Sequence, residues 1–329
     1  EGEKINIIGI RSAVHGVNDI RTKRRVQSLI WILFRWAFII GIGYVILYPI
    51  LYMASSAFRG NADVMDPSVI WIPKHYTLLN IRQAFNAMHY PTALANTGRI
   101  MMVSACIQVL VTAMVGYGFA RFEFYGKKIL FAIVIFTILV PAQTTIMPSF
   151  IQMTNFNMFG VADILSVLSG HDVKINLTNT PWVMYLPAIL GMGLRSGLFI
   201  YMFRQFFRNI PKELEEAAII DGCGPYRTFL RVMVPNAGAI FLTAFLFSLV
   251  WYWNEYYLTS LMLNDTPTIT LALAQLQQSL WDTVSTDEYS LLTTRMQAGC
   301  LLTIIPPLVV YLIVQRKFTE SIERSGIVG

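Results

Sequence analysis

The residues that could do chemistry on a substrate are few, and their spacing excludes the common metal sites. The sequence holds four histidines and three cysteines. The histidines are scattered, with no HExxH pattern, and Cys106, Cys223 and Cys300 lie far apart with no CxxC pair. Zinc sites need several such ligands at short spacings. We therefore expect neither a zinc site nor a disulfide scaffold.

A phosphate-binding loop is also missing. Such a loop needs the pattern G-x-x-x-x-G-K-[ST], in which backbone amides hold phosphates and a hydroxyl ligates magnesium. The nearest fragment, Gly118 followed by Gly126-Lys127-Lys128, has the wrong glycine spacing and no serine or threonine. No nucleophile elbow G-x-S-x-G occurs either. The sequence predicts that this chain is not an enzyme and does not bind ATP by itself.

One polar segment, residues 204–236, has an informative order of residues. Asn209 can cap a helix and Pro211 suits its first turn. Gly222 follows where a left-handed residue ends a helix at least cost. The segment predicts a short surface helix, a tight turn, and a second short helix up to Pro235. The positive end of the first helix would stabilise the acidic residues of its first turn, which are Glu213, Glu215 and Glu216.

Two charged residues stand well inside the apolar stretches, away from their ends. Arg195 and Glu255 are costly to bury in a membrane, which suggests a pore or an ion pair. Arg195 could instead line water, and Glu255 could hold backbone groups at a helix break. Five aromatic residues surround Asn254: Trp251, Tyr252, Trp253, Tyr256 and Tyr257. They could stack on sugar rings or form a belt of aromatic residues in the outer leaflet.

The elements that must position these residues are membrane helices. The chain has 329 residues, of which 55% are hydrophobic and 13% charged, against roughly 25% charged in soluble domains. A span needs about 20 apolar residues, because the hydrocarbon core is about 30 Å thick. The sequence predicts an all-α polytopic protein of one domain. Its six predicted spans are residues 36–58, 95–120, 129–151, 183–203, 237–262 and 298–315.

The basic residues orient these spans. With a cytoplasmic N-terminus, the inner segments carry 18 of the 25 lysines and arginines and the outer loops carry 5. Because cytoplasmic loops are enriched in such residues, both ends of the chain are predicted to be cytoplasmic. The chain is predicted to consist of a basic segment 1–35, a membrane domain 36–315 and a tail 316–329. Segment 1–35 does not have the pattern of a signal peptide. The surplus of lysine and arginine over acidic residues thus lies mainly in the segments that flank the membrane on the cytoplasmic side. We therefore expect no nucleic-acid binding.

Prolines and glycines interrupt the apolar stretches. Pro141 and Pro148 lie in the third predicted span, and Pro306-Pro307 lies in the sixth. Prolines in membrane helices commonly mark bends, because they remove backbone hydrogen bonds. Gly193 and Gly197 form a small-xxx-small surface, which predicts close helix packing.

Segment 204–236 resembles the EAA motif of ABC-importer permeases. That motif reads E-A-A, three residues, G, nine residues, an aliphatic, any residue, an aliphatic and P. Here it appears as Glu216-Ala217-Ala218, Gly222 and Val232-Met233-Val234-Pro235. The resemblance implies that Glu216, Ala217, Ala218, Asp221, Gly222 and Pro235 couple the chain to an ATPase.

Further segments resemble the maltose-permease-like branch, in its MalG-type subunit. These are Ala120-Arg121-Phe122, Trp71-Ile72-Pro73-Lys74, Trp253-Asn254-Glu255 and Gln315-Arg316-Lys317-Phe318. Segments 155–181 and 276–295 are longer than usual in that branch. The resemblance implies a carbohydrate-uptake permease in the cytoplasmic membrane of a bacterium or archaeon, embedded in lipid. Its implied partners are a second permease subunit, two ATPase subunits that bind ATP and magnesium, and an extracytoplasmic solute-binding protein.

An ion-gradient-driven secondary transporter is the alternative. Such carriers place acidic residues or broken helices near the membrane midplane, often in duplicated halves. This sequence offers one intramembrane carboxylate, Glu255, and no visible duplication.

Overall fold

The chain folds into helices that run mainly in one direction through an elongated body. A computed structural model describes residues 2–157, 160–171, 174–281 and 289–326. Over these ranges no β-strand occurs, and two isolated bridges join Arg59 to Tyr76 and Phe156 to Ile175. The predicted all-α fold class is therefore confirmed. In chain order the elements are α1 (Gly2–Ala57), α2 (Asn61–Met65), α3 (Leu79–Ala87), α4 (Tyr90–Arg121), α5 (Lys127–Leu139), α6 (Ala142–Thr154), α7 (Val161–Ser169), α8 (Trp182–Ile189), α9 (Ser196–Asn209), α10 (Glu213–Ile220), α11 (Pro225–Thr228), the π-helical turn η2 (Phe229–Met233), α12 (Val234–Asn236), α13 (Gly238–Trp253), α14 (Tyr257–Met262), α15 (Ile269–Trp281) and α16 (Tyr289–Gly326).

Three helices in the described part are long and apolar enough to cross a membrane. They are Gln27–Ala57 of α1, Tyr90–Arg121, which is all of α4, and Leu291–Gln315 of α16. Two bent pairs, α5 with α6 and 225–236 with α13, raise the number to five if each pair counts as one span. The number of six spans therefore stays a prediction.

The third predicted span is bent at a proline. Helices α5 and α6 meet at an angle of 103°, and Pro141 stands between them with an extended backbone. The residue before a proline is driven out of the helical region, and Val140 is extended accordingly. The expected bend is confirmed at Pro141, whereas Pro148 and Pro306-Pro307 lie inside continuous helices.

The fourth predicted span is not a continuous helix, so the sequence-based prediction of one helix over 183–203 is wrong. Helix α8 ends at Ile189 and α9 begins at Ser196. Between them Gly191 has φ of 71° and Arg195 has φ of 56°. This left-handed backbone cannot continue a right-handed helix. The fifth predicted span is interrupted too, between Trp253 and Tyr257.

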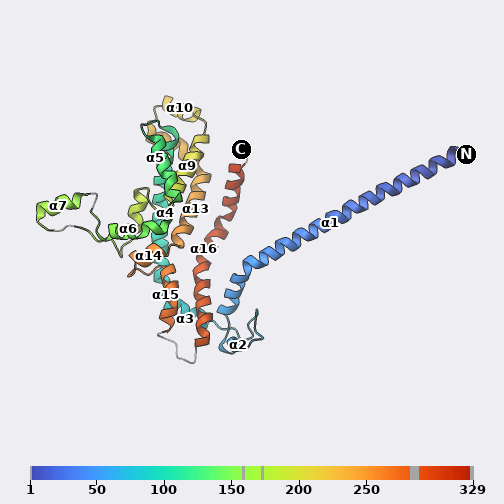
Figure 1. Cartoon of the computed structure of the whole chain (residues 1–329), viewed down its shortest axis with the longest axis horizontal. Helices are drawn as coiled ribbons and strands as arrows, with labels where there is room; N and C mark the ends of the chain where they lie inside the picture. Colours follow the sequence, from blue (N-terminus) through green and yellow to red (C-terminus); the bar gives the residue numbers. More distant parts are fainter. Residues whose placement is uncertain (1, 158–159, 172–173, 282–288, 327–329) are drawn as a thin grey trace.

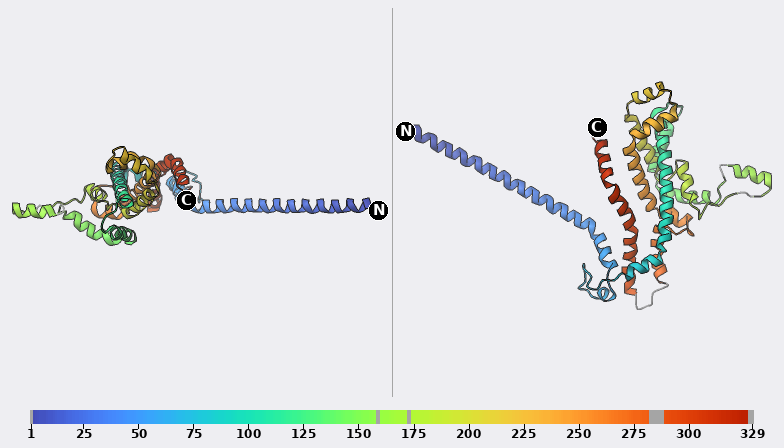
Figure 2. Two further views of the ribbon diagram at one scale, coloured as in Figure 1. Left: turned by 90° about the horizontal axis from the view of Figure 1, so that it is seen from above. Right: turned by 180° about the vertical axis from the view of Figure 1, so that it is seen from behind.

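Helix α4 lies at the centre of the membrane body and contacts α8, α9 and α13. Figure 1 and the right-hand view of Figure 2 show it running along the length of this body. Gly116 lets α9 approach closely, because a Cβ at this position would lie 2.6 Å from the Cβ of Phe203. Gly197 likewise faces α5, where an added Cβ would meet the Thr137 side chain. The predicted close packing at Gly193 and Gly197 is confirmed, with Gly193 against Gln108 and Tyr252.

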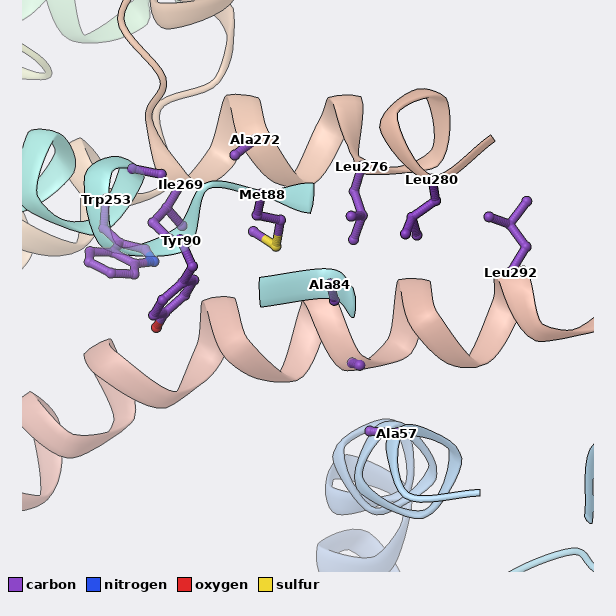
Figure 3. Close-up of a cluster of buried hydrophobic side chains, with 12 residues drawn as sticks. Ala57, Ala84, Met88, Tyr90, Trp253, Ile269, Ala272, Leu276, Leu280 and Leu292 are labelled. Atoms are coloured by element: carbon purple, nitrogen blue, oxygen red, sulfur yellow. The ribbon is translucent and has the colours of Figure 1, made fainter. Parts of the chain in front are cut away.

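A buried apolar cluster joins the helices at the end of the body opposite α10 (Figure 3). It draws side chains from the end of α1, from α3, from the start of α4, from α13, α15 and α16. Met88 and Leu276 are among its most buried members. Tyr90 extends from this cluster and donates its hydroxyl hydrogen to the Leu302 carbonyl at 2.9 Å. The cluster therefore holds together segments that are far apart in the sequence.

Helix α1 projects away from the body over most of its length (Figures 1 and 2). Its membrane-length part, Gln27–Ala57, has no buried residue in its most apolar window. The helix continues without a break across residue 35, and α16 continues across residue 315. The boundaries proposed for the terminal segments therefore do not coincide with helix ends.

Candidate coupling site and intramembrane polar residues

The predicted surface helix exists as α10, at one end of the molecule (Figure 1). It begins at Glu213 with Lys212 as its N-terminal flanking residue and no side-chain cap. The expected capping role of Asn209 is wrong, because this residue is the last one of α9. A turn at Ile210 and Pro211 separates the two helices, since Ile210 is extended as residues before proline usually are.

The turn after α10 has the glycine-terminated geometry that the spacing predicts. Gly222 has φ of 79°. Its N–H donates to the Ile219 carbonyl at 2.9 Å, and the N–H of Cys223 donates to the Ala218 carbonyl at 2.9 Å. The bond from Cys223 spans five residues, as in the Schellman ending of a helix. Asp221 lies within this turn and is exposed.

The outer face of α10 presents the motif to the surroundings. Glu216 and Ala217 are exposed, whereas Ala218 is 6% exposed. Apolar side chains accompany them: Leu214 is 42%, Ile219 63% and Ile220 86% exposed. Large apolar side chains gathered on one small exposed helix commonly mark a protein interface.

The second predicted helix is present as three short continuous pieces, α11, η2 and α12. Pro225 occupies the first turn of α11, where its missing N–H costs nothing. Pro235 lies in α12 and is exposed. Residues 225–236 then meet α13 at an angle of 83°. The segment from Glu216 to Pro235 thus covers α10 and its return to the membrane body.

Glu215 is the acidic residue of α10 that points into the protein. Its Oε2 lies 2.9 Å from the Nε of Arg121, and the two side chains are 12% and 6% exposed. Its Oε1 accepts a hydrogen bond from the Tyr117 hydroxyl at 2.8 Å. Arg121 also donates through Nη2 to the Ile210 carbonyl at 2.5 Å. The sequence gives three neighbouring glutamates and does not tell which one faces inward, so this contact was missed.

Aromatic rings pack beneath the ion pair of Glu215 and Arg121. The Tyr117 ring lies 5.7 Å from that of Phe207, 5.2 Å from that of Phe229 and 5.5 Å from that of Phe122, between centroids. Phe207 and Phe229 are fully or nearly fully buried. Offset and edge contacts of this kind add to the stabilisation from burial. The last turns of α4 and α9 and the η2 turn are therefore packed together directly under α10.

Arg195 stands at the break between α8 and α9. Its guanidinium carbon lies 5.1 Å from the centre of the Trp251 ring, in a cation–π arrangement. The ion pairs among the described residues do not join Arg195 to Glu255. Trp251 in turn stacks on Phe247, with ring centres 6.0 Å apart. The structure therefore brings Arg195 to an aromatic face and not into a direct ion pair.

Glu255 holds the backbone at the break between α13 and α14. Its Oε1 accepts a hydrogen bond from the Leu258 N–H at 2.8 Å. Its carbonyl accepts from the hydroxyls of Thr259 at 2.7 Å and Thr270 at 3.1 Å. Asn254 is exposed and donates to the Val250 carbonyl at 2.8 Å. These contacts match the role of holding backbone groups at a helix break, which is one of the two roles considered for Glu255.

The loop after α1 carries a buried carboxylate. Asp63 is 2% exposed; it accepts the backbone N–H of His75 at 2.8 Å and lies 2.7 Å from the Nδ1 of that residue. Burial by itself would raise the pKa of Asp63, but these hydrogen bonds outweigh it and lower the pKa. Asn80 donates to the Ala57 and Arg59 carbonyls, which closes the end of α1.

Metal-ligand geometry does not occur in the part of the chain that the structure describes. No group of three or more histidine, cysteine or acidic side chains is placed there to hold an ion.

Comparison with a solved structure supports the fold. The chain is similar to the crystal structure of a bacterial ABC transporter involved in the import of the acidic polysaccharide alginate, with a TM-score of 0.68 and 21% identity over 88% of this chain and 96% of that one. At this identity the likeness concerns the fold alone. The described residues therefore have the all-helical fold seen in a membrane transporter.

Sequence relatives agree with this class. The chain is 28% identical over 302 residues to the arabinooligosaccharides transport system permease protein AraQ of Halalkalibacterium halodurans, covering 89% of this chain and 96% of the relative. It is 27% identical over 288 residues to the trehalose transport system permease protein SugB of Mycobacterium tuberculosis, covering 88% and 94%. The lactose transport system permease protein LacG of Rhizobium radiobacter is 25% identical over 280 residues, covering 84% and 90%. The chain belongs to the family of binding-protein-dependent transport system inner membrane components, whose model matches residues 108–323.

Proposed function

We propose that this chain forms half of the translocation pathway of a carbohydrate ABC importer and is driven by ATPase subunits that dock on α10. Family membership supports the class of transporter. It favours an ABC importer over the ion-driven alternative. The finer assignments, which are the cargo, the partner arrangement, the roles of individual residues and the orientation of the chain ends, are part of the proposal.

The observation that carries the coupling proposal is the exposed face of α10. Glu216 and Ala217 lie there beside Ile219 and Ile220, the latter 86% exposed. An apolar face of this kind gains stabilisation when a protein surface covers it. Glu216 adds a charge that a cationic group in an ATPase cleft can pair with. Gly222 and Asp221 form the turn that sets the helix direction.

Helix α1 supports the proposed second permease subunit. Its part from Leu29 to Leu51 exposes large apolar side chains and packs little against its own chain. Lipid and a homologous subunit together offer the surroundings that such a helix needs. Two permease subunits with one ATPase subunit each then give a symmetric pathway in the membrane.

The names of the relatives support a neutral sugar or oligosaccharide as cargo. A solute-binding protein would deliver it to the proposed outer face. Arg195, Asn254 and Glu255 lie at helix breaks and are proposed to shape or line the pathway. An uptake assay with a panel of neutral and acidic oligosaccharides tests the cargo, and transport of acidic chains alone would contradict this part of the proposal.

The docking proposal is tested by reversing one charge. We expect Glu216→Lys to lower co-purification of the ATPase subunits and to abolish uptake, because a like charge then faces the ATPase cleft. Glu123→Lys is the control. Glu123 is exposed in the neighbouring loop and forms an i,i+4 ion pair with Lys127, a kind of pair that contributes little. Full assembly and full transport in the Glu216 variant would refute docking through α10.

The orientation is tested by labelling in a variant without the native cysteines. A cysteine at Tyr125, which is fully exposed beyond α4, should react only from the cytoplasmic side. A cysteine at Leu78, which is 67% exposed before α3, should react only from outside. The reverse result would invert the proposed topology and with it the cytoplasmic position of both ends.

A further inference from the structure

We infer that Glu215 and Arg121 are a positioning pair that transmits movement of α10 to the centre of the membrane body. The inference rests on the proposed docking of ATPase subunits at α10. It assigns a role to a residue outside the E-A-A triplet and to the last residue of α4.

Without this pair α10 has little to hold it. The helix has eight residues, and Ala218 is the one buried residue among them. Burial of a single methyl group gives only a small stabilisation. The contacts from Glu215 to Arg121 and Tyr117 are therefore the main tie between α10 and the spanning helices.

The pair is rigid because both partners are held on more than one side. Arg121 reaches Glu215 in α10 and the Ile210 carbonyl in the linker that precedes it. Glu215 also accepts from Tyr117, whose ring is packed between Phe207 and Phe229. Charged groups that are largely removed from water interact more strongly than surface pairs, since solvent screens them less. A displacement of α10 must therefore displace the end of α4.

Helix α4 can carry that displacement across the membrane. It is unbroken from Tyr90 to Arg121, whereas the spans beside it are interrupted between α8 and α9 and between α13 and α14. At its far end the Thr97 hydroxyl oxygen accepts the N–H of Ile269 at 2.8 Å, and Asn96 donates to the Pro267 carbonyl at 3.1 Å. A continuous helix thus connects the motif helix with the start of α15.

The pair also gives the adjacent residues Glu215 and Glu216 different roles. Glu216 faces outward, where a partner can reach it, and Glu215 faces inward, where no partner can. Neutralising Glu216 should act on assembly. Neutralising Glu215 should leave the outer face of α10 intact and act on coupling.

The test uses the complete transporter with its ATPase subunits and binding protein in lipid vesicles. We expect Glu215→Gln to retain the ATPase subunits and basal ATP hydrolysis, while sugar uptake per ATP hydrolysed falls roughly tenfold, within the usual range of coupling between sites. Glu213→Gln is the matched control: it removes the same charge from an exposed position of the same helix. It should behave as the unaltered protein.

A distance measurement separates transmission from general damage. Spin labels at Lys212, beside α10, and at Leu110, on the exposed side of α4, should give one narrow distance distribution in the unaltered complex. The distribution should broaden with Glu215→Gln and stay narrow with Glu213→Gln. The double variant Arg121→Gln/Glu215→Gln should be no worse than the single one, because no unpaired buried charge remains.

Three results would overturn the inference. Normal coupling with a narrow distribution in Glu215→Gln would show that the pair transmits nothing. Loss of the ATPase subunits from Glu215→Gln, with Glu213→Gln intact, would assign Glu215 to docking instead. Additive losses in the double variant would show that the two residues act separately. Failure of the proposed function is distinct, because the unaltered chain would then not bind ATPase subunits at all.

Discussion

Gly116 sets the distance between α4 and α9, and enlarging it should cost measurable stability. In Gly116→Ala the added Cβ would meet three atoms too closely: the Cβ of Phe203 at 2.6 Å, the N of Arg204 at 3.0 Å and the O of Ile200 at 3.1 Å. Carbon atoms in contact stand about 3.5–4.0 Å apart, so α9 must move away by about 1 Å. None of these atoms is the free end of a flexible side chain.

The expected magnitude follows from two opposing effects. Overpacking of a close contact costs about 1–3 kcal/mol, and we expect about 3 kcal/mol because backbone atoms must shift. Alanine gains about 1 kcal/mol over glycine in a helix interior. The net loss for Gly116→Ala is therefore about 2 kcal/mol, from the difference between these two effects.

Gly118 provides a control on the same helix. A Cβ at Gly118 meets nothing within 4 Å, so Gly118→Ala should keep only the gain of about 1 kcal/mol. The assay is the thermal unfolding midpoint in one detergent, followed by size-exclusion chromatography with fluorescence detection. At roughly 2 °C for each kcal/mol in a large chain, the two variants should differ by roughly 6 °C. Equal midpoints, or a higher one for Gly116→Ala, would refute the close contact.

Four further predictions concern other sites. Gly222→Val should reduce co-purification of ATPase subunits, because the left-handed backbone at φ of 79° costs about 1–2 kcal/mol with a side chain; unchanged co-purification would contradict this. Because the pKa of Asp63 is lowered in the folded loop, the ionised Asp63 should stabilise the loop fully above about pH 4, which is the ordinary pKa of an aspartate, and less as the pH falls below it. Limited proteolysis of the loop over this pH range measures the effect, and Asp63→Asn should abolish the pH dependence. Glu255→Gln should support more transport than Glu255→Leu, because glutamine still accepts the Leu258 N–H, and equal uptake would argue against the backbone role. If Arg195 and Glu255 share one polar network, Arg195→Met with Glu255→Gln should harm uptake less than the two single effects combined, and strict additivity would separate them.

The elements that the sequence predicted well depend on local rules. The distance from Glu216 to Gly222 predicts a short helix with a left-handed end, and α10 has that form with φ of 79° at Gly222. Pro141 predicts a bend, and the helices meet there at 103°. These outcomes require only backbone preferences within a few residues, which a sequence carries directly.

The features that were missed depend on distant partners. The break at 190–195 contains Gly193, which the sequence pattern predicts to be a packing residue only, whereas the left-handed backbone at Arg195 is visible only once the fold is known. Pro148 resembles Pro141 in sequence but lies inside α6. Glu215 turns inward because Arg121 and Tyr117 lie beside it, and those residues are about one hundred positions earlier in the chain.

The attachment of α1 has a consequence for the order in which the protein matures. This helix contacts α16, and α1 precedes α16 in the chain by more than two hundred residues, so it leaves the ribosome well before its partner. Its membrane-length part, Gln27–Ala57, is apolar enough to insert on its own. It must then remain in lipid without its partner until α16 has been made, because contacts between distant segments form late. Quality-control proteases that recognise unpaired membrane helices would therefore find α1 exposed during that interval.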